Sequence, residues 1–199
     1  MKTKAKEKRH DQIAEAAYAV LAEKGYLGLS MLAVAKRAKA SNETLYRWYG
    51  DKAGLFQSLI EHNAQQVSDY LEQVLDAADG ANEALGALAP KLLELLLSDR
   101  AIALNRAAAA DASGTLGKVL ALSGRDSVLP RVQTLMERQT EIDIAPLTGA
   151  EAAALLVELL VGDQQIRRAI GVLPQPTQAQ IDQRATLALD RFRLLCSGA

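Results

Sequence analysis

The chain has 199 residues, 49% hydrophobic and 24% charged, a composition that is ordinary for a folded protein of one or two domains. No stretch approaches the roughly 20 uncharged apolar residues that a membrane span needs, and the charged N-terminus is unlike a secretory signal. One cysteine and two histidines exclude an internal disulfide and leave little material for a metal centre. We therefore expect a cytoplasmic protein with no membrane contact, metal or cofactor.

Charge is distributed unevenly along the chain. Residues 1–52 contain 11 Lys and Arg against 6 Asp and Glu, a net charge of +5, whereas residues 53–199 carry a net charge of −6. Six of the eight aromatic residues also lie within the first 56 positions. Because a basic segment attracts polyanions, the sequence indicates a head at 1–52 that meets nucleic acid and a separate body at 53–199.

The head is predicted to begin with an arm and a helix. Residues 1–8 are rich in lysine, and we expect them to be frayed. Apolar side chains then recur at helical spacing from Ile13 to Leu21, and Gly25 is well placed to end this helix.

Two short helices are predicted next, separated by a break at 39–40. The hydroxyl of Ser30 can cap the first and that of Ser41 the second, because each can accept a hydrogen bond from the amides of the following turn. In the second helix Leu45 and Tyr49 lie four residues apart, and we expect both to face inward. The buried side of the first helix is predicted to consist of Leu32, Val34, Ala35 and Ala38.

The body is predicted to be helical throughout, since no segment alternates with period two. Asp51 can cap a long helix, and the patterns Thr148 with Glu151 and Thr177 with Gln180 mark two later helix starts. Residues 113–124 are interrupted by Gly and Ser. The expected helices cover about 52–79, 82–97, 99–112, 128–140, 149–170 and 177–195. The fold class is therefore all-α.

Residues 30–49 have the pattern of a helix-turn-helix, in which the second helix enters the major groove of DNA. Small alanines in the first helix allow close packing, and the second helix offers polar side chains to phosphates and bases. The alternative is a helical hairpin buried in another fold, which the +5 charge of the head disfavours. The polar face comprises Asn42, Glu43, Thr44, Tyr46, Arg47 and Trp48.

The head resembles the TetR repressor family in the order and spacing of its motifs over residues 10–62. The matching motifs are Ile13-Ala-x-Ala-Ala17, Leu21-Ala-Glu-Lys-Gly-Tyr26, Ser30-Met31, Ala35-Lys-Arg-Ala38, Ser41, Thr44-Leu-Tyr46, Lys52 and Leu55-Phe56. The body resembles the AefR-like subgroup of TetR C-terminal domains through Gly162-Asp163, Arg167 and Pro174-x-Pro176-Thr177.

The resemblance implies a homodimer with an N-terminal three-helix DNA-binding domain and a larger C-terminal domain that binds a small molecule and dimerises. Ligand binding would tilt the long linking helix and separate the two heads, so a repressor would leave its palindromic operator. A ligand-independent DNA-binding adaptor or activator is the alternative. No catalytic triad order, phosphate-binding loop or metal cluster is present in the sequence, so we do not expect an enzyme.

The resemblance also assigns roles to individual positions. Ser30, Tyr46 and Lys52 correspond to residues that contact DNA phosphates. The residues that correspond to groove-facing positions are Asn42, Thr44, Arg47 and Trp48. Ser41 and Glu43 complete the expected DNA-binding set.

Two positions depart from the family pattern. Lys39 stands where many members have a turn glycine, and it would be strained if that site needs a positive φ. Glu43 stands where a small residue is common. Its carboxylate either restricts readout, by accepting a hydrogen bond from cytosine N4, or turns away to pair with Lys39 or Arg47.

The body is expected to hold a hydrophobic or aromatic ligand between the long helix and residues 113–140. Helix 149–170 is apolar on nearly all sides, which predicts burial, and with the last helix it would form an isologous four-helix dimer interface. The candidate pocket residues are Tyr70, Asn105, Gln133 and Met136. The candidate interface residues are Leu155, Leu159, Ile166, Ile181, Leu189 and Phe192.

Overall fold

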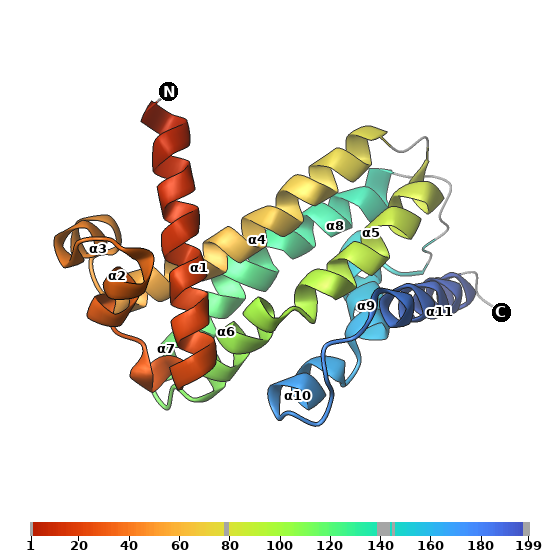
Figure 1. Cartoon of the computed structure of the whole chain (residues 1–199). Coiled ribbons are helices and arrows are strands. Elements are labelled where there is room, and N and C mark those ends of the chain that lie inside the picture. The colour runs from red at the N-terminus through yellow and green to blue at the C-terminus, as the bar shows by residue number, and fades with distance from the viewer. Residues whose placement is uncertain (1, 78–79, 139–143, 145, 197–199) are drawn as a thin grey trace.

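The computed structural model describes residues 2–77, 80–138, 144 and 146–196, and within these ranges the backbone contains helices and no strands. Figure 1 shows the N-terminal helices gathered at one end, with α4 leading from them into the body and α11 at the opposite end. None of the described helices combines the length and the apolarity that crossing a membrane requires. The helices are α1 (Lys2–Gly28), α2 (Met31–Ala38), α3 (Asn42–Tyr49), α4 (Lys52–Ala77), α5 (Ala81–Leu96), α6 (Asp99–Ala109), α7 (Thr115–Leu120), α8 (Asp126–Arg138), α9 (Gly149–Val161), α10 (Gln164–Ala169) and α11 (Gln178–Cys196).

Helix α1 begins at Lys2, so the expectation of a frayed arm is wrong over residues 2–8. Lys, Ala and Glu dominate this stretch and are all good helix formers. Gly25 adopts φ 64 and ψ −179, a conformation that its missing Cβ permits, and it ends the regular helix as expected before one further turn.

The helix-turn-helix is built as its sequence predicts. Ser30 Oγ accepts from the Ala33 amide at 3.2 Å, and Ser41 Oγ accepts from the Thr44 amide at 3.0 Å. Between the two helices Lys39 has φ 50 and ψ 44, the left-handed conformation that makes a lysine there strained.

The buried face of α2 differs from the prediction at one position. Met31, Val34, Ala35 and Ala38 are buried, whereas Leu32 is 52% exposed. Because successive residues of a helix are about 100° apart, burying Met31 turns its neighbour Leu32 toward solvent.

In the body, two predicted elements are replaced by finer structure. The interrupted stretch at 113–124 contains α7 and a π-helical turn over Ala121–Arg125. The single helix expected over 149–170 is divided, because Gly162 at φ 50 and ψ −131 ends α9 before α10 begins. The capping box of Thr148 and Glu151 is confirmed. The predicted ends at 79 and 140 lie outside the described residues.

Two large apolar clusters form the interior. The head cluster joins α1–α3 to the first turns of α4 and to α6 and α7, with Ile13, Leu45 and Leu104 among its buried members. The body cluster joins α4, α5, α8, α9 and α11. Helix α6 therefore packs against the N-terminal helices, while the far end of α4 belongs to the body.

Candidate nucleic-acid interface

The outward face of α3 carries most of the predicted DNA-contacting side chains. Leu45 is completely buried and fixes which side of this short helix faces the head core. Asn42, Glu43, Tyr46 and Arg47 are exposed on the other side, at positions related by one helical turn. The structure thus brings four polar side chains together on one surface, where their donors and acceptors can meet phosphates and base edges.

Ser30, Ser41 and Thr44 lie at the two helix starts beside this face. Both serines are exposed and use their oxygens as caps, and Ser41 Oγ lies 2.8 Å from Thr44 Oγ1. Helix starts present unpaired amides, which makes them favourable places for a phosphate. Glu43 forms no ion pair with Lys39 or Arg47 within the described part of the chain, so its carboxylate stays on the outward face.

Lys52 has a partner inside the head. Its Nζ donates to the carbonyl oxygen of Tyr26 at 2.5 Å and lies 3.9 Å from the centre of that ring. Partial burial lowers the pKa of Lys52. This lysine therefore ties the start of α4 to the end of α1, and only the remaining ammonium hydrogens can meet a phosphate.

Trp48 differs most from its predicted role. Its indole is half-buried and stacks on the imidazole of His10, with ring centroids 4.3 Å apart and an interplanar angle of 21°. Tyr49 is also half-buried, and its hydroxyl lies 3.0 Å from His10 Nδ1. His10 continues the buried stripe of Ile13 and Ala17 one turn upstream, and this spacing could have identified it from the sequence.

The candidate pocket residues are only partly brought together: Tyr70 packs against the body cluster that contains Met136, whereas Asn105 lies on α6, whose Leu104 belongs to the head cluster. Met136 fills the body core at 1% exposure, and Gln133 donates to Glu137 along α8. Tyr70 Oη donates to the Ala87 carbonyl at 3.3 Å, and Asn105 donates to the Ala101 carbonyl at 2.8 Å. Met136 was expected to line a pocket, but the closely packed core leaves it no free face.

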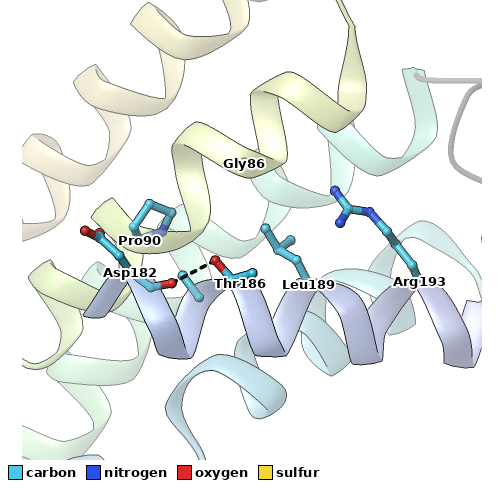
Figure 2. Close-up of a pocket in the computed structure, with 7 residues that line it drawn as sticks. Gly86, Pro90, Asp182, Thr186, Leu189 and Arg193 are labelled. Atoms are coloured by element: carbon cyan, nitrogen blue, oxygen red, sulfur yellow. Dashed lines mark hydrogen bonds between the residues drawn. The ribbon is translucent and has the colours of Figure 1, made fainter. Parts of the chain in front are cut away.

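Two hollows lie elsewhere on the body. One of about 410 Å³ runs between α5 and α11, and Figure 2 shows Asp182, Leu189 and Arg193 along α11 beside Gly86 and Pro90 of α5. The other, of about 290 Å³, lies where the chain turns from α10 into α11 and includes Pro174, Gln183 and Leu187. Neither hollow is lined by any of the four candidate pocket residues, although Leu189, a candidate interface residue, lines the first.

Three candidate interface residues are inside the protomer. Ile181, Leu189 and Phe192 are at most 5% exposed, because this side of α11 packs on α5 and α9, so little of their surface is left for a second copy. Leu155 and Leu159 are half-buried against the body core, and Ile166 is exposed. Leu187 and Leu194, seven residues apart on the opposite side of α11, are exposed, and so is Leu195 on the flank of the buried side; sequence reasoning missed all three.

The first turn of α6 joins the head to the C-terminal part of the body. Arg100 pairs with Glu15 of α1 and lies 5.3 Å from the centre of the Tyr18 ring. Its neighbour Asp99 accepts from Arg168 of α10 at 2.5 Å. Adjacent residues therefore hold two helices that are far apart in sequence.

Comparison with known proteins agrees with this geometry. Residues 13–59 match the family described as bacterial regulatory proteins, tetR family, and residues 83–194 match the AefR-like transcriptional repressor C-terminal domain. The fatty acid metabolism regulator protein of Bacillus subtilis (strain 168) is 29% identical over 101 residues, which are 51% of this chain and 52% of that protein. The chain thus matches about half the length of this curated relative.

Solved structures share the fold over nearly the whole chain. A TetR-family regulator from Mesorhizobium loti is 26% identical with a TM-score of 0.79, covering 94% of this chain and 96% of that one. A TetR regulator from Agrobacterium tumefaciens is 28% identical with a TM-score of 0.70, covering 94% and 93%. FadR from Bacillus subtilis, solved with stearoyl-CoA, is 18% identical with a TM-score of 0.72, covering 94% and 98%, and shows the shared fold alone.

The predicted family and fold class are confirmed by these matches and by the helix-turn-helix at residues 30–49. The chain belongs to the TetR family of DNA-binding transcriptional regulators, with a C-terminal domain of the AefR-like type, and it is not an enzyme.

Proposed function

We propose that this protein is a homodimeric repressor that binds a palindromic operator and leaves it when a small hydrophobic ligand binds its body. In this proposal residues 1–52 are the DNA-binding domain and residues 53–199 the ligand-binding and dimerisation domain. The observation that carries it is the outward polar face of α3, at a basic end of the chain. Ser30, Ser41, Tyr46 and Lys52 contact phosphates, while the base-reading residues are Asn42, Glu43, Thr44 and Arg47.

An exposed apolar surface supports the dimer. Leu187, Leu194 and Leu195 on α11 and Ile166 and Ile170 on or beside α10 all present large apolar side chains to solvent. Large apolar side chains left in solvent favour a contact surface, because burying them against a partner removes apolar area from water. A two-fold pairing would place two α3 helices about 34–36 Å apart, on successive turns of one DNA face.

The ligand class is supported by relatives. FrrA is a flavonoid-responsive regulator that is 24% identical, and FadR of Bacillus subtilis is solved with stearoyl-CoA. Stearoyl-CoA carries a long apolar acyl chain, and a flavonoid has an aromatic ring system. In this chain Met136 fills the core of the predicted site, so a ligand must displace it. The body with this closed, filled core would then be the state that binds the operator.

The joint at the start of α6 gives a physical route from ligand to head. Arg168 is buried and holds Asp99, while Arg106 donates to the carbonyls of Arg168 and Ala169. A ligand that shifts the body helices would move α6 with them. Because Arg100 pairs with Glu15, that movement would reach α1 and change the distance between the two heads.

The closed body also favours the alternative function, a DNA-binding adaptor or activator that needs no ligand. Selection of binding sites from random duplex DNA, followed by salt titration of the best site, separates the outcomes. A palindromic winner whose affinity falls steeply with salt is expected. Release of that site by a long-chain acyl-CoA or a flavonoid would support the repressor, whereas unchanged binding with both would favour the adaptor. No enrichment over random sequence would contradict operator binding.

A further inference from the structure

We propose that His10 is a positioning residue that sets the orientation of the recognition helix α3, and that Trp48 acts through His10 rather than by contacting bases. This inference rests on the proposed operator binding by α3. It reassigns Trp48, which the family pattern places among the groove-facing residues, and it gives a function to a histidine outside the helix-turn-helix.

Three rings interlock where α3 ends. The imidazole of His10 stacks on Trp48 and meets the Tyr49 ring edge-on, with centroids 5.7 Å apart and an interplanar angle of 87°. Trp48 and Tyr49 are themselves 6.4 Å apart at 67°. Aromatic pairs in such stacked and edge-on geometries contribute beyond the apolar area that they bury. We call His10, Trp48 and Tyr49 the ring cluster.

A hydrogen bond between Tyr49 and His10 fixes the orientation of the imidazole within the ring cluster. Burial raises the pKa of Tyr49 to about 12, so its hydroxyl stays protonated at neutral pH. The hydroxyl can therefore donate to His10 Nδ1 across the 3.0 Å that separates them, which places the imidazole proton on Nε2. A ring held by one stack, one edge contact and one hydrogen bond has little freedom to rotate.

The ring cluster matters because α3 has few other anchors. The helix spans eight residues, and Leu45 is its only buried side chain. A short helix fixed at one point can pivot about it, whereas a second contact at its C-terminal end fixes its direction. Arg9, next to His10, donates to the Lys39 carbonyl at 2.7 Å and so holds the turn that precedes α3. Helix α1 thus restrains the chain on both sides of the recognition helix.

The same geometry removes Trp48 from the base-contacting set. One face of its indole is covered by the imidazole, and the residue is half-buried. Asn42, Glu43 and Arg47 remain exposed on the outward face. Because base readout by hydrogen bonds depends on donors placed to within a few tenths of an ångström, a pivot of α3 would harm specific binding more than phosphate-driven binding.

The test uses the full-length protein, its selected operator and a random duplex of equal length. His10→Ala is expected to weaken operator binding about tenfold or more while changing random-duplex binding less than about threefold, since phosphate contacts tolerate small rotations. His10→Phe keeps an aromatic ring for the stack and should restore most of the loss. His62→Ala, which changes the other histidine of the chain, is the matched control and should bind like the wild type. Melting curves confirm that each variant is folded at the assay temperature.

Trp48 is the only tryptophan of the chain, so its fluorescence reports the ring cluster directly. Acrylamide should quench Trp48 more strongly in His10→Ala than in the wild type, and His10→Phe should reverse this change. In a double-mutant cycle, His10→Ala with Trp48→Ala should bind the operator no more weakly than either single variant, because both remove one interaction.

Three results would overturn the inference. Operator affinity of His10→Ala within twofold of the wild type would show that α3 needs no such restraint. Additive losses in the cycle would show that Trp48 contacts DNA itself. Unchanged quenching in His10→Ala would show that the stack does not shield the indole. If the wild type selects no operator, the proposed function fails instead, and the quenching experiment still tests the ring cluster in the free protein.

Discussion

At the scale of single residues, the turn between α2 and α3 holds a lysine in a conformation that suits glycine. Lys39 has φ 50, and its amide caps α2 by donating to the carbonyls of Ala35 and Lys36. Replacing it by glycine removes the steric strain, and the larger backbone entropy of unfolded glycine offsets only part of that gain. Lys39→Gly should therefore raise the free energy of unfolding by about 0.5 kcal/mol, measured by urea denaturation.

Lys36→Gly is the control, because this residue lies inside α2 with ordinary helical geometry. It should lower the free energy of unfolding by about 1 kcal/mol. A loss of stability in both variants would show that the left-handed turn imposes no strain on Lys39.

Tyr46 offers a test of the phosphate role that the family pattern assigns to it. Its side chain is exposed on the outward face of α3, so Tyr46→Phe removes a hydroxyl without disturbing the core. Losing one hydrogen bond to a charged phosphate should weaken operator and random-duplex binding alike, by about tenfold. Fluorescence anisotropy measures both affinities. Tyr70→Phe, in the body, should leave both unchanged, and a loss restricted to the operator would indicate base contact instead.

The lowered pKa of His10 predicts how the free energy of unfolding depends on pH. Burial lowers its pKa below the ordinary 6.5, Lys6 and His62 act in the same direction, and Asp11 opposes them. The unfolded chain therefore binds a proton on this residue more readily than the folded protein does. Its contribution to stability is complete above pH 6.5 and is lost as the pH falls through the lower folded value.

His10→Gln, which does not titrate, should accordingly lose less stability than the wild type as the pH is lowered from about 7.5 to 5. Urea denaturation at several pH values measures the difference. His62→Gln measures the effect of the second histidine, including its influence on the pKa of His10. Parallel pH profiles of wild type and His10→Gln would contradict the prediction.

At the scale of elements, the contact between α6 and α10 depends on one asymmetric ion pair. The Arg168 side chain is 5% exposed, whereas that of Asp99 is 78% exposed. Asp99→Asn leaves the buried guanidinium of Arg168 without its counter-charge, which lowers the free energy of unfolding. Because Asp99 itself is exposed and screened by water, the loss is smaller than for a fully buried ion pair. We expect a destabilisation of about 1–3 kcal/mol by urea denaturation.

Asp163→Asn provides the control for this pair. Asp163 and Arg167 form an exposed ion pair one helical turn apart, with 3.8 Å between the charged atoms. Its removal should change the free energy of unfolding by less than about 0.5 kcal/mol. Equal effects of the two substitutions would show that burial of Arg168 does not matter.

The break between α9 and α10 shows why the sequence predicted one helix there. Apolar periodicity continues across Gly162, and a glycine inside a helical pattern is often tolerated. In the structure Arg184 donates to the carbonyls of Leu159 and Leu160, which satisfies the end of α9 from another helix. Gly162 is the one local signal at the break, and the cap that α11 supplies cannot be recognised from the neighbouring sequence.

At the scale of the whole molecule, the exposed side of α11 should decide the oligomeric state. Leu194→Glu places a charge among large apolar side chains, and Leu194 is 69% exposed, so the protomer fold should tolerate it. We expect this variant to sediment as a monomer and to bind the operator at least about tenfold more weakly. The two subunits that contact the two half-sites would no longer be held together.

Leu122→Glu is the matched control, since Leu122 is 68% exposed on the π-helical turn, away from α11. It should remain dimeric, and a dimeric Leu194→Glu would refute the proposed interface. Deleting α11 would be a poorer test, because Phe192 and Ile181 of that helix belong to the apolar cores and their loss would disturb the protomer itself.

The sequence by itself determined the features that depend on neighbouring residues. Helix starts at Ser30, Ser41 and Thr148 follow from side chains that cap amides three residues ahead, and a cap of this kind needs no tertiary contact. The all-α fold, the family and the outward polar face of α3 follow equally from local periodicity and motif spacing.

Only the tertiary structure decided which of two apolar stripes faces inward and which polar groups meet across the fold. Leu189 and Leu194 look alike in the sequence, yet the first is buried against the protomer and the second lies in solvent. His10 and Trp48 stack although they lie on different helices. Periodicity specifies how residues are arranged around one helix, but the direction in which that helix faces is set by the packing of all its neighbours together.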